Sequence, residues 1–395
     1  MCVVSKPSPL PRNVKLLGWT SFFNDIASEI IYPLMPQFLI TVLGGSRFLL
    51  GVIEGVAESI GSLLKLWSGS WSDRAGSRKP FVVAGYSLAA LTRPLIGVVT
   101  APWQLFLARV VDRLGKGVRT SPRDALIADC TEPDARGRAF GFQRALDHLG
   151  AAIGPVIAAV FLWLWPGELR LLFVLTIIPG VIVVGLLAFG LRETGVVNKE
   201  KHQRFSLSIR PLSGKFRLYL ASMTIFTLGN SSDAFLLVRA TELGVATMWL
   251  PILWCVFHII KSIGSRAIGM PIDKYGAARI ILLGWALYAG VYLGFGLATH
   301  TWHAWALFCG YGIVQALTEP AEKTMVANLS AAEHRGLAYG WFNFVVGIAA
   351  LPASVLFGWL YEQHGPLIPF GIGATLAFVA AAVLSGVGSD RLTAR

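Results

Sequence analysis

The chain has 395 residues, of which 54% are hydrophobic and 14% are charged, and its mean hydropathy is +0.62. Because charged residues make up about a quarter of an average soluble domain, this composition excludes a soluble globular protein and predicts a membrane protein. The formal net charge of +12 would also suit a nucleic-acid partner. We expect none, because the basic residues gather in the loops of one side of the membrane, as described below.

Apolar runs of about 18 to 25 residues recur along the whole chain, and a helix of that length crosses about 30 Å of hydrocarbon. They are longer than the strands of a membrane barrel, which have about ten residues, so the predicted fold class is an all-α membrane protein. The lipid bilayer is therefore an expected partner. Twelve transmembrane helices are predicted, at residues 15–42, 48–71, 80–100, 103–127, 138–163, 170–191, 216–240, 247–268, 279–299, 303–327, 338–362 and 367–386.

The first predicted helix carries two acids four residues apart, Asp25 and Glu29, which therefore share one face. A carboxyl group buried among apolar helices binds a proton more readily than one in water, which is what proton coupling requires. We predict that these acids are the proton-coupling groups and that Arg113 and Lys116 of the fourth helix are their ionic partners. The alternative is a static structural pairing in which the acids only neutralise those bases.

A glycine-rich, charged segment, GSWSDRAGSRK at 69–79, follows the second predicted helix, and GMPIDKYGAAR at 269–279 repeats its pattern after the eighth. The glycines permit a tight turn, and the charged side chains can form ion pairs that hold helix ends together. An ordinary turn with basic loop residues explains one copy, but a repeat favours a shared function. The residues that carry the pattern are Gly69, Asp73, Arg74, Gly76 and Arg78, and in the second copy Asp273 and Arg279; their assignment to gating is what the family resemblance given below implies.

The fourth predicted helix is the most highly charged segment of the chain. Arg109, Arg113 and Lys116 recur at intervals of three or four residues, so they form a stripe on one face. A charge that faces lipid costs several kcal/mol, and the stripe is therefore expected to face the bundle interior or water. Asp124, near the inner end of this helix, is assigned to gating.

Two interpretations of the basic stripe remain open. Arginine offers a planar fork that suits carboxylate or phosphate, which favours binding of an anionic or zwitterionic solute. Alternatively, acids of neighbouring helices, such as Glu54 and Glu58 in the second, neutralise the stripe. For the same reason, Arg93 in the third helix is expected to pair with Glu54 or Glu58.

The fifth predicted helix contains the sequence GAAIGPVIAA, with Gly150, Gly154 and Pro155. Small residues four apart let two helices approach closely, and proline adds a kink, so the stretch suits a packed yet movable contact. The alternative is plain helix packing. We assign these three residues to gating.

The connection 192–215 is the long polar interruption of the chain, and it falls at the middle. We interpret it as a linker between an N-terminal six-helix bundle, 15–191, and a C-terminal six-helix bundle, 216–386. Lys and Arg residues gather in this connection and in the loops on the same side as the termini. Positive charge favours the cytoplasmic side, so both termini and the linker are predicted to be cytoplasmic.

The second half repeats the placement of polar residues inside helices. Tyr311, Gln315, Glu319 and Glu322 lie at helical spacing along the tenth predicted helix, and Asp233 lies in the seventh. The sequence contains no Gly-x-x-x-x-Gly-Lys-Ser/Thr phosphate loop, and its histidines and four cysteines lack metal-ligand spacing. We therefore expect no metal, no cofactor and no use of ATP.

The segment at 69–79, its copy at 269–279 and the twelve predicted helices resemble the major facilitator superfamily of secondary transporters, over essentially the whole chain. The resemblance implies two pseudo-symmetric six-helix bundles around a cavity lined by helices one, four, seven and ten. The Gly-Pro stretch of the fifth helix is similar to a signature of antiporter branches. The substrate site that the resemblance implies comprises Asn24, Tyr32, Arg109, Arg113, Lys116, Asp233, Tyr311, Gln315, Glu319 and Glu322.

The predicted function is proton-coupled transport of a small organic solute, anionic or zwitterionic, across the cytoplasmic (inner) membrane. Alternating access is the expected mechanism, with export by antiport favoured and a single chain as the working unit. A proton-symport importer of an organic anion and a transporter-like sensor that does not transport are the alternatives. We expect no enzyme, because no nucleophile and base are grouped near the middle of the helices.

Overall fold

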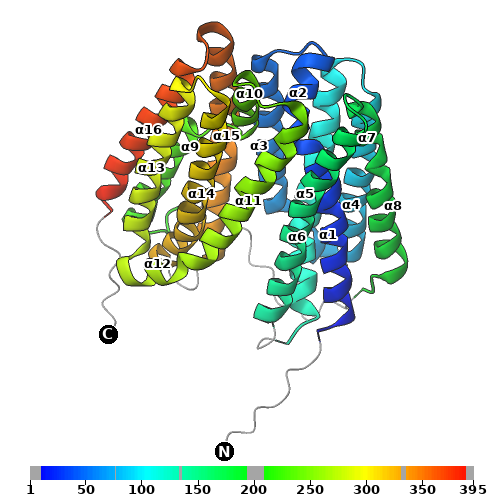
Figure 1. Ribbon diagram of the computed structural model, residues 1–395. Coiled ribbons are helices and arrows are strands. Elements are labelled where there is room, and N and C mark those ends of the chain that lie inside the picture. The colour runs from blue at the N-terminus through cyan, green and yellow to red at the C-terminus, as the bar shows by residue number, and fades with distance from the viewer. Residues whose placement is uncertain (1–9, 76, 133–135, 194–208, 331–334, 388–395) are drawn as a thin grey trace, which may run out of the picture.

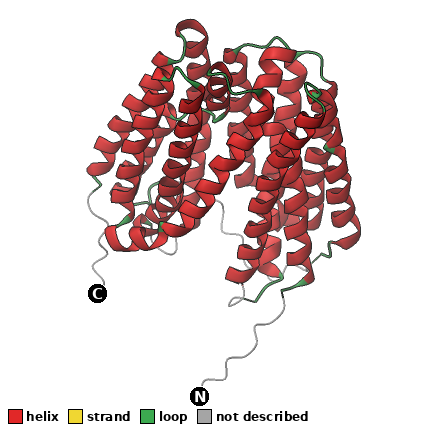
Figure 2. Ribbon diagram, in the orientation of Figure 1, coloured by secondary structure: helices red, strands yellow, loops and turns green. Residues whose placement is uncertain are grey.

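The computed structural model describes residues 10–75, 77–132, 136–193, 209–330 and 335–387, and throughout these ranges the regular elements are helices (Figure 2). They form twelve long helical segments, so the predicted all-α class is confirmed. In Figure 1 the start of the first segment and the end of the last lie toward the same end of the molecule, which we call the terminal end. We call the opposite end the distal end.

The first six segments pack against one another as the N-terminal bundle (Figure 1). The first segment is irregular in its second half, where Pro33 and Pro36 lack the N–H group that a continuous α-helix requires. The segments are α1 (Arg12–Ile31) with η1 (Tyr32–Leu34), α2 (Met35–Gln37) and η2 (Phe38–Val42); α3 (Arg47–Ala75); α4 (Lys79–Leu95) with η3 (Ile96–Val98); α5 (Pro102–Asp129); α6 (Arg136–Leu164); and α7 (Leu169–Leu175) with α8 (Ile177–Gly185) and η5 (Leu186–Gly190).

The last six segments form the C-terminal bundle. Its segments are α9 (Gly214–Gly229) with α10 (Ala234–Glu242); η6 (Thr247–Trp249) with α11 (Leu250–Ala267) and α12 (Gly269–Tyr275); α13 (Ala277–Leu297); α14 (Thr301–Leu329); α15 (Arg335–His364); and α16 (Leu367–Ser385). The division of the chain at 192–215 stays a prediction, and residues 194–208 of that connection lie outside the described part.

The seventh segment is interrupted at its middle, because α9 ends at Gly229 and the helix resumes only at Ala234. Backbone groups released by such a break inside a membrane need new partners. The Gly229 carbonyl accepts a hydrogen bond from the Tyr288 hydroxyl at 3.0 Å. The non-helical residues 230–233 are thus held in place beside the centre of the C-terminal bundle.

Seven of the twelve segments are long and apolar enough to be recognised as membrane spans by length and hydropathy alone. The five others are the first, second, fourth, seventh and tenth, formed by α1, α3, α5, α9 with α10, and α14. These five segments also contribute residues to the cavities described below. Hydropathy therefore misses the segments that carry the polar interior.

The two bundles touch at the distal end and in the middle, and they diverge toward the terminal end (Figure 1). In the middle, the Ser59 hydroxyl of α3 donates to the Gly347 carbonyl of α15 at 2.6 Å. At the distal end, the Arg47 guanidinium lies 2.6 Å from Glu242, and the Arg47 backbone N–H donates to Glu362 at 2.8 Å. The conformation is therefore closed at the distal end.

Gly51 of α3 offers a test of this closed contact. A Cβ atom there would overlap the backbone carbonyl of Ser354 in α15. We expect Gly51→Ala to open the distal end, because the overlapping atoms are backbone and move apart only if the helices separate. Spin labels placed on the distal ends of the two bundles should report a longer distance in this variant. Gly290→Ala is the control, since its added Cβ meets no atom within 4 Å, and equal distances in both variants would contradict the prediction.

Candidate functional site

Two adjoining cavities share lining residues, one between the bundles and one lined by residues of the C-terminal bundle. The first measures about 220 Å³ and takes its walls from both bundles. The second measures about 160 Å³ and extends into the C-terminal bundle, where Gln315, Glu319 and Glu322 line it. Both are lined by Thr227, Asn230 and Val346. The other residues that line the first are Tyr32, Glu54, Glu58, Arg113, Ser231, Ser232, Asp233, Ala350 and Ser354.

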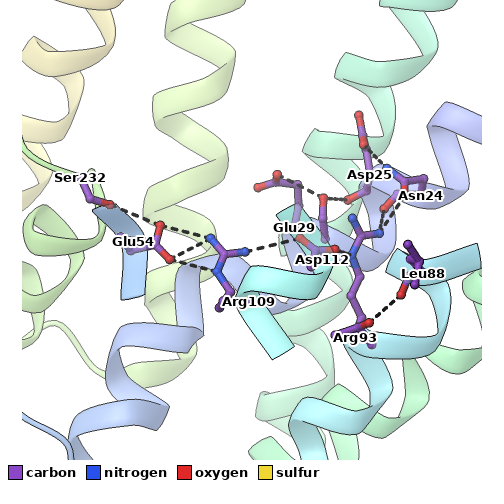
Figure 3. Close-up of polar contacts among 11 residues, drawn as sticks. Asn24, Asp25, Glu29, Glu54, Leu88, Arg93, Arg109, Asp112 and Ser232 are labelled. Carbon is purple, nitrogen blue, oxygen red and sulfur yellow. Dashed lines mark hydrogen bonds and ion pairs between the residues drawn. The ribbon is translucent and has the colours of Figure 1, made fainter. Parts of the chain in front are cut away.

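The first basic residue of the α5 stripe, Arg109, forms ion pairs with acids of the protein (Figure 3). Arg109 binds both carboxylate oxygens of Glu54 in α3, the shorter distance being 2.8 Å, and both side chains are buried. Asp112, one turn along α5, lies 3.0 Å from Arg93 of α4 and 3.7 Å from Arg109. Arg93 also donates to the backbone and side-chain oxygens of Asn24 in α1, at 2.7 and 2.9 Å.

We call Glu54, Arg93, Arg109 and Asp112 the buried ion-pair network. Its two guanidinium groups face two carboxylates, so the network is neutral by itself, as buried charges require. The predicted pairing of Arg93 with Glu54 or Glu58 is wrong, because Arg93 binds Asp112 and Glu54 binds Arg109. The Ser232 hydroxyl donates to Glu54 at 3.4 Å, which joins the network to the break in the seventh segment.

The next two basic residues of the stripe differ from Arg109 in their ionic contacts. Arg113 and Lys116 have no ion-pair partner within 4.0 Å in the described part of the chain. The Arg113 Nε atom is buried without a hydrogen-bond partner, whereas Lys116 is exposed. Glu58 of α3 interacts electrostatically with both of them and with Lys65. Three cations therefore share one carboxylate on this wall.

Asp25 and Glu29 also lack a cationic partner within 4.0 Å among the described residues. Asp25 accepts a hydrogen bond from the Asn24 amide at 2.8 Å, and Glu29 accepts one from the Trp254 indole at 2.8 Å. Their direct partners are thus neutral donors and not the basic residues of α5. Trp254 belongs to α11, so the bond to Glu29 crosses from one bundle to the other.

On the opposite wall, the structure brings together three residues that the sequence assigned to substrate binding. The Tyr311 hydroxyl of α14 donates to the Asp233 carboxylate at 2.6 Å, and the Gln315 amide donates to Tyr311 at 2.8 Å. Asp233 lies at the start of α10, directly after the break. No ion pair to Asp233 is formed within the described ranges.

The two remaining acids of α14 differ in their surroundings. Glu319 is ion-paired with Lys261 of α11 at 2.9 Å and with Lys323 at 2.8 Å. Glu322 lines the second cavity without an ion-pair partner among the residues that the structure describes. Of this pair, only Glu322 leaves a carboxyl group without a countercharge.

The glycine-rich segment that was assigned to gating is described only in part. Gly76 and the side chains of Asp73, Arg74 and Asp273 lie outside the described residues, and so does any contact of Gly69. Arg78 binds Asp129 at the end of α5 with 2.6 Å between Nε and Oδ2. This pair joins the turn after α3 to the terminal end of α5.

Glu193, which follows the sixth segment, is a further partner of the same turn. Its carboxylate accepts a hydrogen bond from the Ser77 hydroxyl at 2.5 Å and from the backbone N–H groups of Arg78 and Lys79 at 3.1 Å each. No spacing pattern in the sequence points to Glu193, because it lies more than a hundred residues from its partners.

The remaining residues assigned to gating make no described contact between the two bundles. Asp124 pairs with its neighbour Arg123 at 2.8 Å, and Arg279 is exposed at the start of α13. Gly150 and Gly154 of α6 lie against α1, where a Cβ atom would meet backbone, and Pro155 lies inside α6. The close approach is therefore between two helices of one bundle.

Three comparisons place the chain among known proteins. The family model of the Major Facilitator Superfamily matches residues 17–351 and 260–391. An uncharacterised MFS-type transporter of Methanocaldococcus jannaschii is 32% identical over 381 residues, which cover 95% of this chain and 94% of that protein. The multidrug resistance protein MdtH of Photorhabdus laumondii is 26% identical over 358 residues, with coverages of 86% and 84%. A mutant of the nucleoside transporter NupG has a TM-score of 0.80 at 12% identity, over 95% of this chain and 99% of that one.

Proposed function

The chain belongs to the Major Facilitator Superfamily, and from that premise we propose that it is a proton-coupled transporter that exports a small organic solute by antiport. The solute is anionic or zwitterionic and binds in the cavities between the bundles. The bundles open alternately to the two sides of the cytoplasmic membrane. With both termini in the cytoplasm, the described conformation is the one that is open to the cytoplasm.

The charge inventory of the interior is the observation that carries this proposal. The buried ion-pair network is neutral without Asp25 and Glu29, and neither acid has a cation within 4.0 Å in the described part of the chain. Both acids are half-buried, and a charge that is partly removed from water without an ionic partner is costly, whereas a protonated carboxyl group is not charged. These two acids are therefore suited to take up a proton and release it again.

The bond between Glu29 and Trp254 links proton binding to conformation. An ionised carboxylate accepts a stronger hydrogen bond than a protonated one, so ionised Glu29 binds the opposite bundle more tightly. It then holds the empty carrier open to the cytoplasm until a solute binds. After the solute has left outside, a proton taken up by Glu29 neutralises the carboxyl group for the return, and release of this proton to the cytoplasm restores the stronger bond to Trp254.

Two observations support export. The relatives include proteins named multidrug resistance protein, and Gly150 and Gly154, which precede Pro155, let α6 pack closely on α1, next to the acids that we assign to coupling. Small residues at such a contact allow one helix to slide or tilt on the other without side-chain clashes. Gly154 is adjacent to Glu29 itself, because a Cβ atom on Gly154 would meet the Glu29 side chain at 3.1 Å.

The test is proton movement in proteoliposomes that contain the purified protein and a pH-sensitive dye. Organic anions, zwitterions, cations and neutral solutes of similar size are offered in turn. Solute-dependent proton movement opposite to the solute supports antiport. Movement of both in the same direction would replace antiport by symport import, and binding without any flux would replace transport by sensing.

Trp254→Phe is expected to raise the proton leak in the absence of solute by about tenfold, because the variant loses one hydrogen bond to a charged group. The same dye assay measures this leak. Trp341→Phe is the matched control, since the indole N–H of Trp341 has no hydrogen-bond partner in the described structure. A leak that is equal in the two variants would show that the inter-bundle bond does not restrain the empty carrier.

A further inference from the structure

The two walls of the first cavity have opposite electrostatic character. We infer that the solute is a zwitterion that lies across this cavity, with its anionic group on Arg113 of the N-terminal bundle and its cationic group on Asp233 of the C-terminal bundle. This inference rests on the proposed function in one respect, namely that the cavity between the bundles is the solute site.

The N-terminal wall requires an anion. Arg113 lines the cavity, and its Nε atom is buried without a hydrogen-bond partner. A guanidinium group left in this state gains most from a carboxylate or phosphate, which accepts two parallel hydrogen bonds. The acid already present, Glu58, is shared with Lys65 and Lys116, so this wall keeps an excess of positive charge.

The C-terminal wall requires a cation or a strong hydrogen-bond donor. Asp233 lines the same cavity and accepts one hydrogen bond, from the neutral Tyr311 hydroxyl. The closest cation in electrostatic terms, Lys261, is already bound to Glu319. A primary amine carries a positive charge and three N–H donors, so it can bind the Asp233 carboxylate beside the hydrogen bond from Tyr311.

Solutes with a single charge fit this arrangement less well. An anion without a cationic group compensates Arg113 but is repelled by Asp233, and a cation meets the converse problem. A neutral solute that displaces water from the cavity leaves the charges of Arg113 and Asp233 without compensation. A compact zwitterion neutralises both walls and also bridges the two bundles, which is what a solute must do if its binding is to drive their rearrangement.

The experiment measures binding to the full-length protein in detergent by calorimetry, without a proton gradient. The probes are glycine, β-alanine, γ-aminobutyrate and δ-aminovalerate, each compared with the carboxylate and the amine of the same length, and with glutarate. We expect one zwitterion to bind at least about tenfold more tightly than both of its singly charged analogues, because each charged contact in a partly buried site is worth about a factor of ten. If none of the four exceeds its analogues, the inference is wrong.

Two variants assign the orientation. Arg113→Gln should reduce the affinity of the preferred zwitterion to that of its amine analogue, and Asp233→Asn should reduce it to that of its carboxylate analogue. Lys215→Gln and Glu168→Gln, which change exposed charges outside the cavities, are the controls and should leave the preference unchanged. Equal effects of Asp233→Asn on zwitterion and carboxylate would overturn the orientation.

The outcome is separate from that of the flux assay. Zwitterion selectivity that depends on Arg113 and Asp233, in a protein that moves no protons, would support this inference and refute proton coupling. Proton-coupled flux of simple anions, with no gain from an added amine, would support the proposed function and refute the zwitterion. Arg113→Lys distinguishes loss of the charged contact from misfolding, because a variant that keeps the charge should recover part of the selectivity lost in Arg113→Gln.

Discussion

Replacement of both unpaired acids, by Asp25→Asn with Glu29→Gln, is expected to reduce solute-dependent proton movement to the level of empty liposomes. Neither side chain could then bind and release a proton, and no other carboxyl group of α1 in the described range is available to do so. Exchange of solute across the membrane should continue, because the amides keep the size of the acids and the cavity keeps Arg113 and Asp233. Dye fluorescence and radiolabelled exchange measure the two processes in one preparation.

The single variants assign the roles within this pair. Glu29→Gln should cause the larger loss, because Glu29 is the acid that bonds to the opposite bundle. Glu168→Gln, at an exposed position before α7, is the control. Proton movement of normal size in the double variant would contradict the coupling role. Glu322, the cavity acid of α14 that has no ion-pair partner in the described structure, would then be the candidate for the coupling group.

Asp112→Ala is expected to lower the free energy of unfolding by about 3–5 kcal/mol, which is the cost of removing one partner from a buried ion pair. The carboxylate compensates Arg93 at 3.0 Å and Arg109 at 3.7 Å, and all three side chains are buried. Without it, Arg93 loses its ion-pair partner and Arg109 keeps only the carboxylate of Glu54. Thermal unfolding in detergent, followed by tryptophan fluorescence, measures the loss.

Asp124→Ala is the matched control on the same helix. Asp124 pairs with its neighbour Arg123, but its side chain is 40% exposed, so we expect a loss of at most about 1 kcal/mol. If the two substitutions destabilise the protein equally, water from the cavity compensates the arginines and the network contributes little to stability. Replacing Glu54 and Arg109 together by Met should cost less than either replacement alone, since no buried charge is then left without its partner.

The helical segments could be predicted because each one has a local signature in the sequence. A long apolar run or an amphipathic polar stripe is visible within one stretch of sequence, so α5 and α14 were recognised as spans although hydropathy alone misses them. The break of the seventh segment after Gly229 was not foreseen. Residues 230–233 contain neither proline nor glycine, and the partner that stabilises the break, Tyr288, lies in another helix.

The candidate site could be predicted only as far as one helix at a time. Spacing showed that Arg109 and Arg113 share a face of α5, but the rotation of α3 and α4 decides which of them finds an acid. Arg109, which is ion-paired with Glu54, and Arg113, which has no ion-pair partner in the described part of the chain, are one helical turn apart. Trp254 was missed because a tryptophan in an apolar helix carries no sign that its N–H group has a carboxylate partner.

The charge of α5 also bears on how the chain enters the membrane. On a biological insertion scale, each Asp, Lys or Arg at the centre of a helix costs about 2.5–3.5 kcal/mol, so α5 alone would be rejected by the translocon. Its insertion requires that α3 and α4 stay next to it during synthesis, until the ion pairs Glu54–Arg109 and Arg93–Asp112 have formed. The same ion pairs that surround the mature cavity thus make the integration of α3, α4 and α5 a single cooperative event of biogenesis.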